Sequence, residues 1–275
     1  MKHLLLIANI SIENRNLLEY SAAFCKHYNC KLHVLHISNY SEPIFISSPY
    51  YYDQNKISYS DYFEEKDVKN IASKVESLID KDLVQVAIKK GNQENILNTF
   101  LNDNFIDFII IGNQDIEAEN DFINHKNLLL NVVDTPLLVV PNLQIFSPFK
   151  NLNFLTNRSE KDILDIIQLS KFFPASKIKV SHQDINGKES AIRDKKWEQY
   201  VSSKVPERIE YNHIQENVGD YVKRENSSLS KDFDAFVFTA KKRNFWSRLI
   251  DPSTTLRYLA GLEMPCIIFK NSEEK

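Results

Sequence analysis

The sequence predicts an α/β protein of two tandem, doubly wound domains, each a five-stranded parallel sheet flanked by helices. Three landmarks recur in the same order in both halves of the 275-residue chain: a strand that ends at Asn, an Asp that leads an apolar strand, and a Pro that leads another. The matched segments are Leu4–Asn9 and Leu152–Asn157, Asp107–Gly112 and Asp234–Thr239, and Pro136–Val140 and Pro265–Phe269. The Asp-to-Pro spacing is 136 − 107 = 29 residues in the first half and 265 − 234 = 31 in the second. We interpret these matches as an internal repeat.

Prolines mark the connection between the two copies. Pro141 and Pro148 bracket a short segment, so we place domain 1 at residues 1–144 and domain 2 at residues 148–275. Domain 1 is longer mainly because of an inserted loop, residues 38–60, which contains a run of tyrosines.

Each copy is predicted to alternate strands and helices from end to end. Strands are expected near 3–8, 31–37, 84–89, 107–112 and 137–140, and then near 152–156, 177–182, 207–214, 234–239 and 265–269. Helices are expected near 13–28, 61–81, 93–103 and 124–133, and then near 160–173, 188–203, 217–228 and 252–262. Continuous apolar runs such as Ile109–Ile111 are typical of strands buried on both faces of a parallel sheet.

The helix expected near 160–173 shows the periodicity of a sheet-covering helix. Ile163, Ile166, Ile167 and Ser170 recur at helical spacing with charges between them, and we expect this face to pack on the sheet. Right-handed crossovers place a ligand site beyond the carboxyl ends of the strands. Those ends are Asn9, Ser38 and Gly112 in the first copy, and Asn157, His182 and Thr239 in the second.

Composition indicates a globular, cytoplasmic protein. The net charge of −3 argues against a nucleic-acid binder, and no apolar stretch is long enough to cross a membrane. The three cysteines, Cys25, Cys30 and Cys266, have no metal-ligand spacing and suit a reducing compartment better than a disulfide framework. The phosphate-loop, dinucleotide-binding and nucleophile-elbow motifs are all absent, so we expect no enzyme activity, no catalytic residues and no metal site.

With these landmarks in place, the chain resembles a tandem universal stress protein over nearly all of its length. The opening strand with its Ala8–Ser11 turn, and the closing unit from Asp251 through the Pro265 strand, are similar to those of that family. The resemblance implies a nucleotide-binding-like fold. It also implies pairing of the last strands, Leu137–Val140 against Cys266–Phe269, so that the two domains form a dimer-like pair within one chain.

ATP-binding members of this family carry a Gly-x2-Gly-x9-Gly-Ser/Thr loop after the fourth strand and an Asp after the first. In the first copy Gly112 fits the first position, but Asp115 and His125 stand where the other glycines belong. Four carboxylates in that loop would repel a triphosphate, so we expect only a vestigial cleft there. Its residues are Asn9, Ser11, Gly112 and Asn113.

The second copy has a basic version of this degenerate motif. Thr239, Lys242 and Pro252 replace the glycines, Ser253 keeps the hydroxyl position, and Asn157 stands in place of the Asp. A cationic loop at a helix N-terminus is a candidate anion or phosphate site. The candidate nucleotide- or anion-binding residues are therefore Asn157, Thr239, Lys241, Lys242, Arg243, Ser253 and Thr254.

We therefore expect a non-enzymatic stress-response or signalling protein without a cofactor, acting through a protein partner or a small ligand. The alternative is an adenine-nucleotide-binding protein, or a weak ATPase, that uses the basic loop of domain 2 with ATP or another adenine nucleotide.

Three features each leave two interpretations open. Ser253 is either a ligand-binding hydroxyl or part of an ordinary helix start after Asp251 and Pro252. The basic cluster from Lys241 to Arg248 is either an anion site or a solvated loop. The tyrosine-rich loop 50–62 is either a surface for a protein partner or a loop that folds back on domain 1. The domain-end strands also offer a route to a homo-oligomer.

Overall fold

The structure, a computed structural model, describes residues 1–7, 15–38, 73, 76–113, 134–183, 188–205, 208–216, 218–227, 232–241 and 263–271. The N-terminal half contributes β1 (Lys2–Ile7), α1 (Arg15–Tyr28), β2 (Cys30–Ser38), the 3-10 helix η2 (Lys81–Leu83), β3 (Val84–Lys90), α3 (Gln93–Asp103), β4 (Phe108–Gly112) and β5 (Leu137–Val140). The C-terminal half contributes β6 (Asn151–Thr156), α6 (Glu160–Phe172), β7 (Lys177–Gln183), α7 (Lys188–Lys204), β8 (Ile209–Ile214), α8 (Val218–Ser227), β9 (Ala235–Lys241) and β10 (Cys266–Asn271).

All ten predicted strands are confirmed, with bounds that shift by two residues or fewer. The predicted helices near 124–133 and 252–262 lie outside the described residues. Of the helix expected near 61–81, Ser73 and residues 76–81 are described; Ser73 and residues 76–78 are helical, but the helix ends before residue 79, and Lys81 begins the 3-10 helix η2. The predicted domain limits at residues 144 and 148 stay a prediction.

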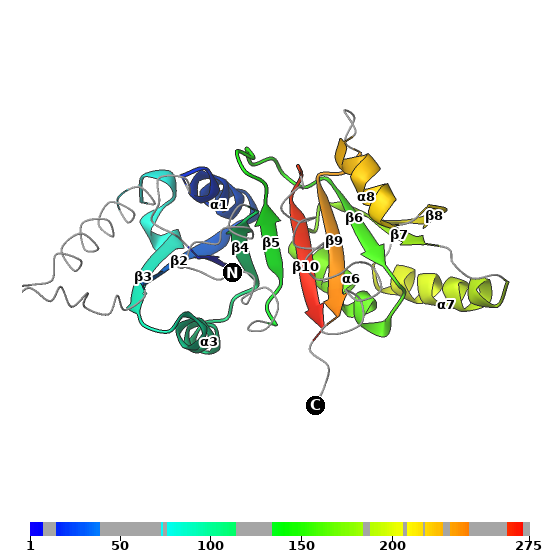
Figure 1. Cartoon of the computed structure of the whole chain (residues 1–275), viewed down its shortest axis with the longest axis horizontal. Helices are drawn as coiled ribbons and strands as arrows, with labels where there is room; N and C mark the ends of the chain where they lie inside the picture. The colour runs from blue at the N-terminus through cyan, green and yellow to red at the C-terminus, as the bar shows by residue number, and fades with distance from the viewer. Residues whose placement is uncertain are drawn as a thin grey trace, which may run out of the picture.

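The strands form one sheet in the order β3-β2-β1-β4-β5-β10-β9-β6-β7-β8 (Figure 1). Each half is a parallel five-stranded unit, and the order in the second half mirrors that in the first. The two units meet where β5 and β10 pair antiparallel, with Val139 opposite Cys266 and Leu137 opposite Ile268. The predicted pairing of the last strands is therefore confirmed, and it covers two apolar edges that would otherwise be exposed.

The repeated Asp and Pro residues have the same structural task in each half. Before β4, the Asp107 carboxylate accepts a hydrogen bond from His3 N at 2.7 Å. Before β9, the Asp234 carboxylate accepts hydrogen bonds from Lys150 N at 2.6 Å and Asn151 N at 2.7 Å. The carbonyls of Pro136 and Pro265 accept from Ile109 N and Phe236 N respectively. These landmarks fasten the amino ends of neighbouring strands.

Alternating strand residues divide the core into one cluster on each face of the sheet. Helices α1, α6 and α7 pack on one face, and α3 and α8 on the other. On the first face, fully buried Phe24 of α1 contacts Phe172 and Phe173 at the end of α6, and Phe146 and Phe149 of the connection. This aromatic cluster joins the two halves away from the β5–β10 seam.

One detail of α6 differs from the sequence prediction. Ile166 and Ser170 are buried as expected, but Asp162 and Asp165 are buried with them, at 2% and 4% exposure. Two of the charges expected between the buried positions are therefore themselves inside. Hydrogen-bonding partners on the sheet and at the start of the helix hold them there.

The remaining sequence expectations concern thiols and membranes. Cys25, Cys30 and Cys266 are buried free thiols, so the chain forms no disulfide among them. Across the described residues, no helix has the length and apolar character to span a bilayer.

Candidate functional site

The strand order places a crevice in each half where the chain reverses direction across the sheet. In the C-terminal half the reversal falls between β6 and β9, and in the N-terminal half between β1 and β4. Ligands of open α/β sheets bind beyond the carboxyl ends of the strands at such points. Asn157, which follows β6, and Thr239 in β9 thus lie at the carboxyl ends of two neighbouring parallel strands, and their role in ligand binding stays a prediction.

Thr239 is turned toward α6. It is 5% exposed, and its hydroxyl donates a 2.7 Å hydrogen bond to Asp165 Oδ2. Burial raises the pKa of the Asp165 carboxyl to about 6, while the Thr239 hydroxyl and Lys161 partly oppose the rise. Thr239, the residue that replaces the first glycine of the motif, therefore has its hydroxyl engaged with a buried carboxylate.

Lys161 lies beside this pair in the first turn of α6. Burial lowers the pKa of its ammonium group, and Asp165, Asp134 and Asp162 oppose that effect. Its Nζ also donates to the carbonyl of Lys270 near the end of β10. The crevice thus contains a half-buried cation surrounded by carboxylates, at a helix end whose dipole attracts anions.

The turn after β6 is fixed by a capping box. Ser159 caps α6 by accepting from Asp162 N, and the Asp162 carboxylate accepts in return from Ser159 N at 3.0 Å. The same carboxylate accepts from the Thr156 hydroxyl at 2.6 Å, and that hydroxyl accepts from Arg158 N at 2.8 Å. Arg158 has a φ of 60°, unusual for a residue with a Cβ. These bonds set the direction in which the Arg158 side chain leaves the turn.

Arg158 forms a buried ion pair across to α7. Its guanidinium lies 3.0 Å from Glu198 Oε1, and the two side chains are 7% and 19% exposed. His213 of β8 lies 3.8 Å from the same carboxylate, and Trp197 donates its indole N–H to the Ser159 carbonyl. Side chains from β8 and α7 are therefore connected to the turn after β6.

The crevice of the N-terminal half is built with fewer charges at its described edge. Gly112 ends β4 in register with Val140, and its predicted place in a vestigial cleft stays a prediction. Asn113 is 7% exposed; its N–H donates to the Val140 carbonyl, and its Oδ1 accepts from Asn142 N at 2.9 Å. Asn113 thus joins β4 to the chain that follows β5.

Several predicted site residues cannot be placed in either crevice. Asn9, Ser11, Lys242, Arg243, Ser253, Thr254 and loop 50–62 lie outside the described residues, and their roles stay predictions. Lys241 was expected in a loop but is the last residue of β9, where it pairs in register with Asn271, the last residue of β10. Sequence reasoning missed Lys161, Asp165, Arg158 and Glu198, because a charge pattern alone does not show which charges are buried.

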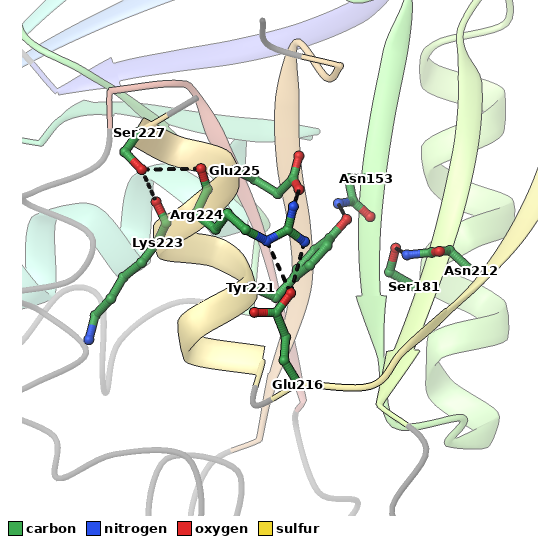
Figure 2. A network of polar contacts seen from close by, with 9 residues as sticks. All are labelled: Asn153, Ser181, Asn212, Glu216, Tyr221, Lys223, Arg224, Glu225 and Ser227. Atoms are coloured by element: carbon green, nitrogen blue, oxygen red, sulfur yellow. Dashed lines mark hydrogen bonds and ion pairs between the residues drawn. The ribbon is translucent and has the colours of Figure 1, made fainter. Parts of the chain in front are cut away.

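A second polar set lies on the opposite face, under α8 (Figure 2). Asn153 of β6 donates to the Tyr221 hydroxyl at 2.9 Å, and Asn212 of β8 donates to the Ser181 hydroxyl at 3.2 Å. Asn153 is fully buried and Ser181 is 1% exposed. One of these hydrogen bonds joins α8 to β6, and the other joins β8 to β7 beneath the helix.

Among the described residues, no three His, Cys, Asp or Glu side chains are grouped so that they could hold a metal ion. What the C-terminal crevice offers is a rigid frame of hydrogen bonds with one half-buried lysine. Such a frame suits recognition of a ligand that carries hydrogen-bond acceptors or negative charge.

Comparison with solved structures places this architecture among known folds. A universal stress protein from Archaeoglobus fulgidus DSM 4304 matches over 99% of this chain and 97% of its own, at 15% identity and a TM-score of 0.66. A putative universal stress protein from Pseudomonas aeruginosa UCBPP-PA14 matches over 98% and 93%, at 11% identity and a TM-score of 0.55. The cytoplasmic domain of a prokaryotic cation chloride cotransporter matches over 99% and 97%, at 10% identity and a TM-score of 0.53.

No protein-family model matches the sequence, and no curated protein matches it. At identities of 10–15% the structural matches speak for the fold, and they do so over nearly the whole length of each chain. The resemblance seen in the sequence is therefore confirmed at the level of architecture. This chain has the fold of the universal stress proteins, with two mirrored five-stranded units in one sheet.

Proposed function

We propose that this chain is a non-enzymatic stress-response or signalling protein of the universal stress type, which acts by binding a small ligand or a protein partner. The observation that carries the proposal is the arrangement of Lys161, Asp165 and Thr239 at the crevice between β6 and β9. The carboxylate and the hydroxyl bond to each other and so form part of the wall. The lysine is the group with which a ligand would pair.

Binding, rather than turnover, agrees with this frame. A hydrolase needs a base within reach of a nucleophile or of a water molecule. Here the Asp165 carboxylate accepts from Thr239 inside the protein, and the Asp162 carboxylate accepts from Thr156 and Ser159 N. Both carboxylates are engaged in holding α6 to the strands.

A second candidate function is adenine-nucleotide binding in the same half. Lys161 supports it, because a cation at a helix N-terminus beside the crevice is suited to a phosphate. The predicted ligands Lys241, Lys242 and Arg243 would supply further positive charge.

Thermal shift with ATP, ADP and cyclic AMP separates the two candidates, since a ligand that binds the native state raises its melting temperature. The leading proposal expects no shift with these nucleotides and no phosphate release from ATP. A shift that disappears in Lys161→Ala and persists in the exposed control Lys171→Ala would favour the nucleotide binder. Phosphate release that depends on Lys161 would overturn the non-enzymatic assignment.

The stress-response part of the proposal is tested in cells. We expect the amount of the protein, measured by quantitative mass spectrometry, to rise when growth is arrested. If the amount of the protein does not change under starvation, heat or oxidative stress, the stress-response assignment is wrong, and the protein is a constitutive binding protein.

A further inference from the structure

A groove of about 390 Å³ runs between β3 and α3 in the N-terminal half. Among the described strands, β3 lies at one edge of the sheet, at the far end of its unit from the β5–β10 seam. The groove is therefore remote from both crevices discussed above, which lie between inner strands. Its volume falls within the range of about 300–1,000 Å³ that is usual for ligand sites.

The floor of the groove is apolar and its walls are polar. Ala87, Ile96 and Phe100 form the floor, and Gln85 and Thr99 stand on opposite walls. On β3 the lining residues are 85, 87 and 89, every second residue of one strand face. From Gln85 to Lys89 the strand rises about 13 Å, enough for roughly five residues of an extended chain.

The two ends of the groove carry opposite charge. Lys89 lies at the end where α3 begins, and the N-terminal dipole of that helix adds to its positive field. Asp103 lies at the other end, at the last residue of α3. Phe105, two residues further on, is 79% exposed, so an apolar side chain adjoins the acidic end.

The equivalent helix positions in the C-terminal half carry larger side chains that contact one another. Ile96 and Thr99 are the fourth and seventh residues of α3, and Tyr221 and Arg224 are the fourth and seventh residues of α8. The Arg224 guanidinium lies over the Tyr221 ring at 5.3 Å and pairs with Glu216 and Glu225. The side chains at these two positions are therefore smaller in α3 than in α8.

We propose that the β3–α3 groove binds an extended peptide segment of a partner protein, which adds as a strand to the edge of β3. An edge strand offers unpaired backbone N–H and C=O groups for main-chain hydrogen bonds, and the groove receives alternate side chains. The preferred segment has small apolar residues at its centre, an acidic residue at the Lys89 end and a basic residue at the Asp103 end. This role does not depend on the proposed function of the C-terminal crevice.

Fluorescence anisotropy with two labelled peptides tests the charge rule in either strand direction. One probe is acetyl-Gly-Glu-Thr-Val-Thr-Lys-Gly-amide, which places Glu, Val and Lys on one strand face, and the other has Lys in place of Glu. We expect the wild-type protein to bind the mixed-charge peptide about tenfold more tightly, because the second peptide places a lysine next to Lys89. In Lys89→Glu both ends of the groove are acidic, and the preference should reverse.

Matched substitutions on α3 test the location. Thr99→Trp fills the groove from an exposed position and should abolish binding, whereas Asn102→Trp, also exposed and outside the lining, should leave it unchanged. Circular dichroism melting of both variants confirms that each is folded. The proposal is overturned if neither peptide binds, if Lys89→Glu leaves the preference unchanged, or if Thr99→Trp binds normally. It is also overturned if sedimentation shows a dimer that only Thr99→Trp dissociates, since the occupant is then a second copy of the chain.

Discussion

Helices α3 and α8 cover the same face of the sheet in the two halves, but they rest on floors of opposite character. Under α8 the floor is polar and hydrogen-bonded, and under α3 the equivalent positions are apolar. The polar set is Asn153, Ser181, Asn212 and Tyr221, and the equivalent set, by strand register and helix position, is Leu5, Leu35, Ala87 and Ile96. The fold thus tolerates polar or apolar residues beneath this helix, because the hydrogen bonds of the repeated Asp and Pro residues lie at the amino ends of the strands and not under the helix.

The largest effect should come from exchanging floor residues between the halves. Leu5→Asn places an amide in an apolar floor at a fully buried position, which should cost about 3–5 kcal/mol of unfolding free energy. Asn153→Leu loses one hydrogen bond to Tyr221. It also removes Oδ1, a buried oxygen without a hydrogen-bond partner among the described residues, so we expect a change within about 1 kcal/mol. Urea denaturation measures both. Equal losses of unfolding free energy would contradict the claim that the fold tolerates either a polar or an apolar floor beneath this helix.

The next largest effect should come from substitutions at the carboxyl edge of the sheet, where the two halves differ in charge. Arg158→Ala leaves the Glu198 carboxylate, 19% exposed, without its close partner and should cost about 3 kcal/mol. Asn113→Ala in the N-terminal half loses one neutral hydrogen bond to Asn142 N and should cost about 1 kcal/mol. A double-mutant cycle with Glu198→Ala isolates the ion pair. A coupling energy near zero would mean that the charged edge of the C-terminal half is no more rigid than the neutral one.

Removing the repeated Asp residue should cost unfolding free energy in proportion to the number of backbone hydrogen bonds that its carboxylate accepts. Asp234 accepts two backbone N–H groups and Asp107 accepts one, so Asp234→Ala should cost about 2 kcal/mol and Asp107→Ala about 1 kcal/mol. Chemical denaturation of both variants under the same conditions gives the ratio. The reverse order would show that the two fastenings are not equivalent.

The smallest effect is a pair of pH dependences with opposite sign. His33 of β2 is 2% exposed and lies 2.9 Å, ring nitrogen to ring nitrogen, from His3, and burial with nearby positive charge lowers its pKa to about 4. Its neutral form is favoured by folding. Its contribution to stability is therefore complete above about pH 6.5, the ordinary value for histidine, and is lost as the pH falls toward 4. Asp165 has a raised pKa of about 6, so its contribution is complete below about pH 3.8 and is lost as the pH rises through 6.

Between pH 4 and 6 the two dependences oppose each other, and the wild-type protein should show a shallow slope. His33→Gln leaves Asp165, so its unfolding free energy should rise toward acid relative to wild type. Asp165→Asn leaves His33 and should show the opposite trend. Unfolding free energies at half-unit steps of pH give both differences. Parallel curves for either variant and the wild type would remove that residue as a titrating group.

Prediction from sequence was strongest where local pattern and physical necessity coincide. Apolar runs and the internal repeat predicted the strands, and the family resemblance implied the β5–β10 pairing, which covers two apolar strand edges. The repeated Asp and Pro residues were recognised as landmarks, although their backbone partners, such as His3 N, were not predictable from spacing.

The candidate site was predictable only in outline. The adjacency of Asn157 and Thr239 follows from strand order, and strand order follows from the fold. The bond from Thr239 to Asp165 joins residues 74 positions apart, and it depends on how α6 rotates against the sheet. Ile163 and Ile166 defined a helical face, but no local signal showed that the rotation carries Asp165 inward.

The antiparallel contact of β5 with β10 has a further consequence for how such a molecule can change. In an assembly of two identical subunits, every substitution appears twice and alters both ligand crevices together. Here both units belong to a single polypeptide, so a substitution such as Leu5→Asn alters one unit and leaves the other as it was. Because the two units are encoded separately within one chain, each is free to acquire its own specificity.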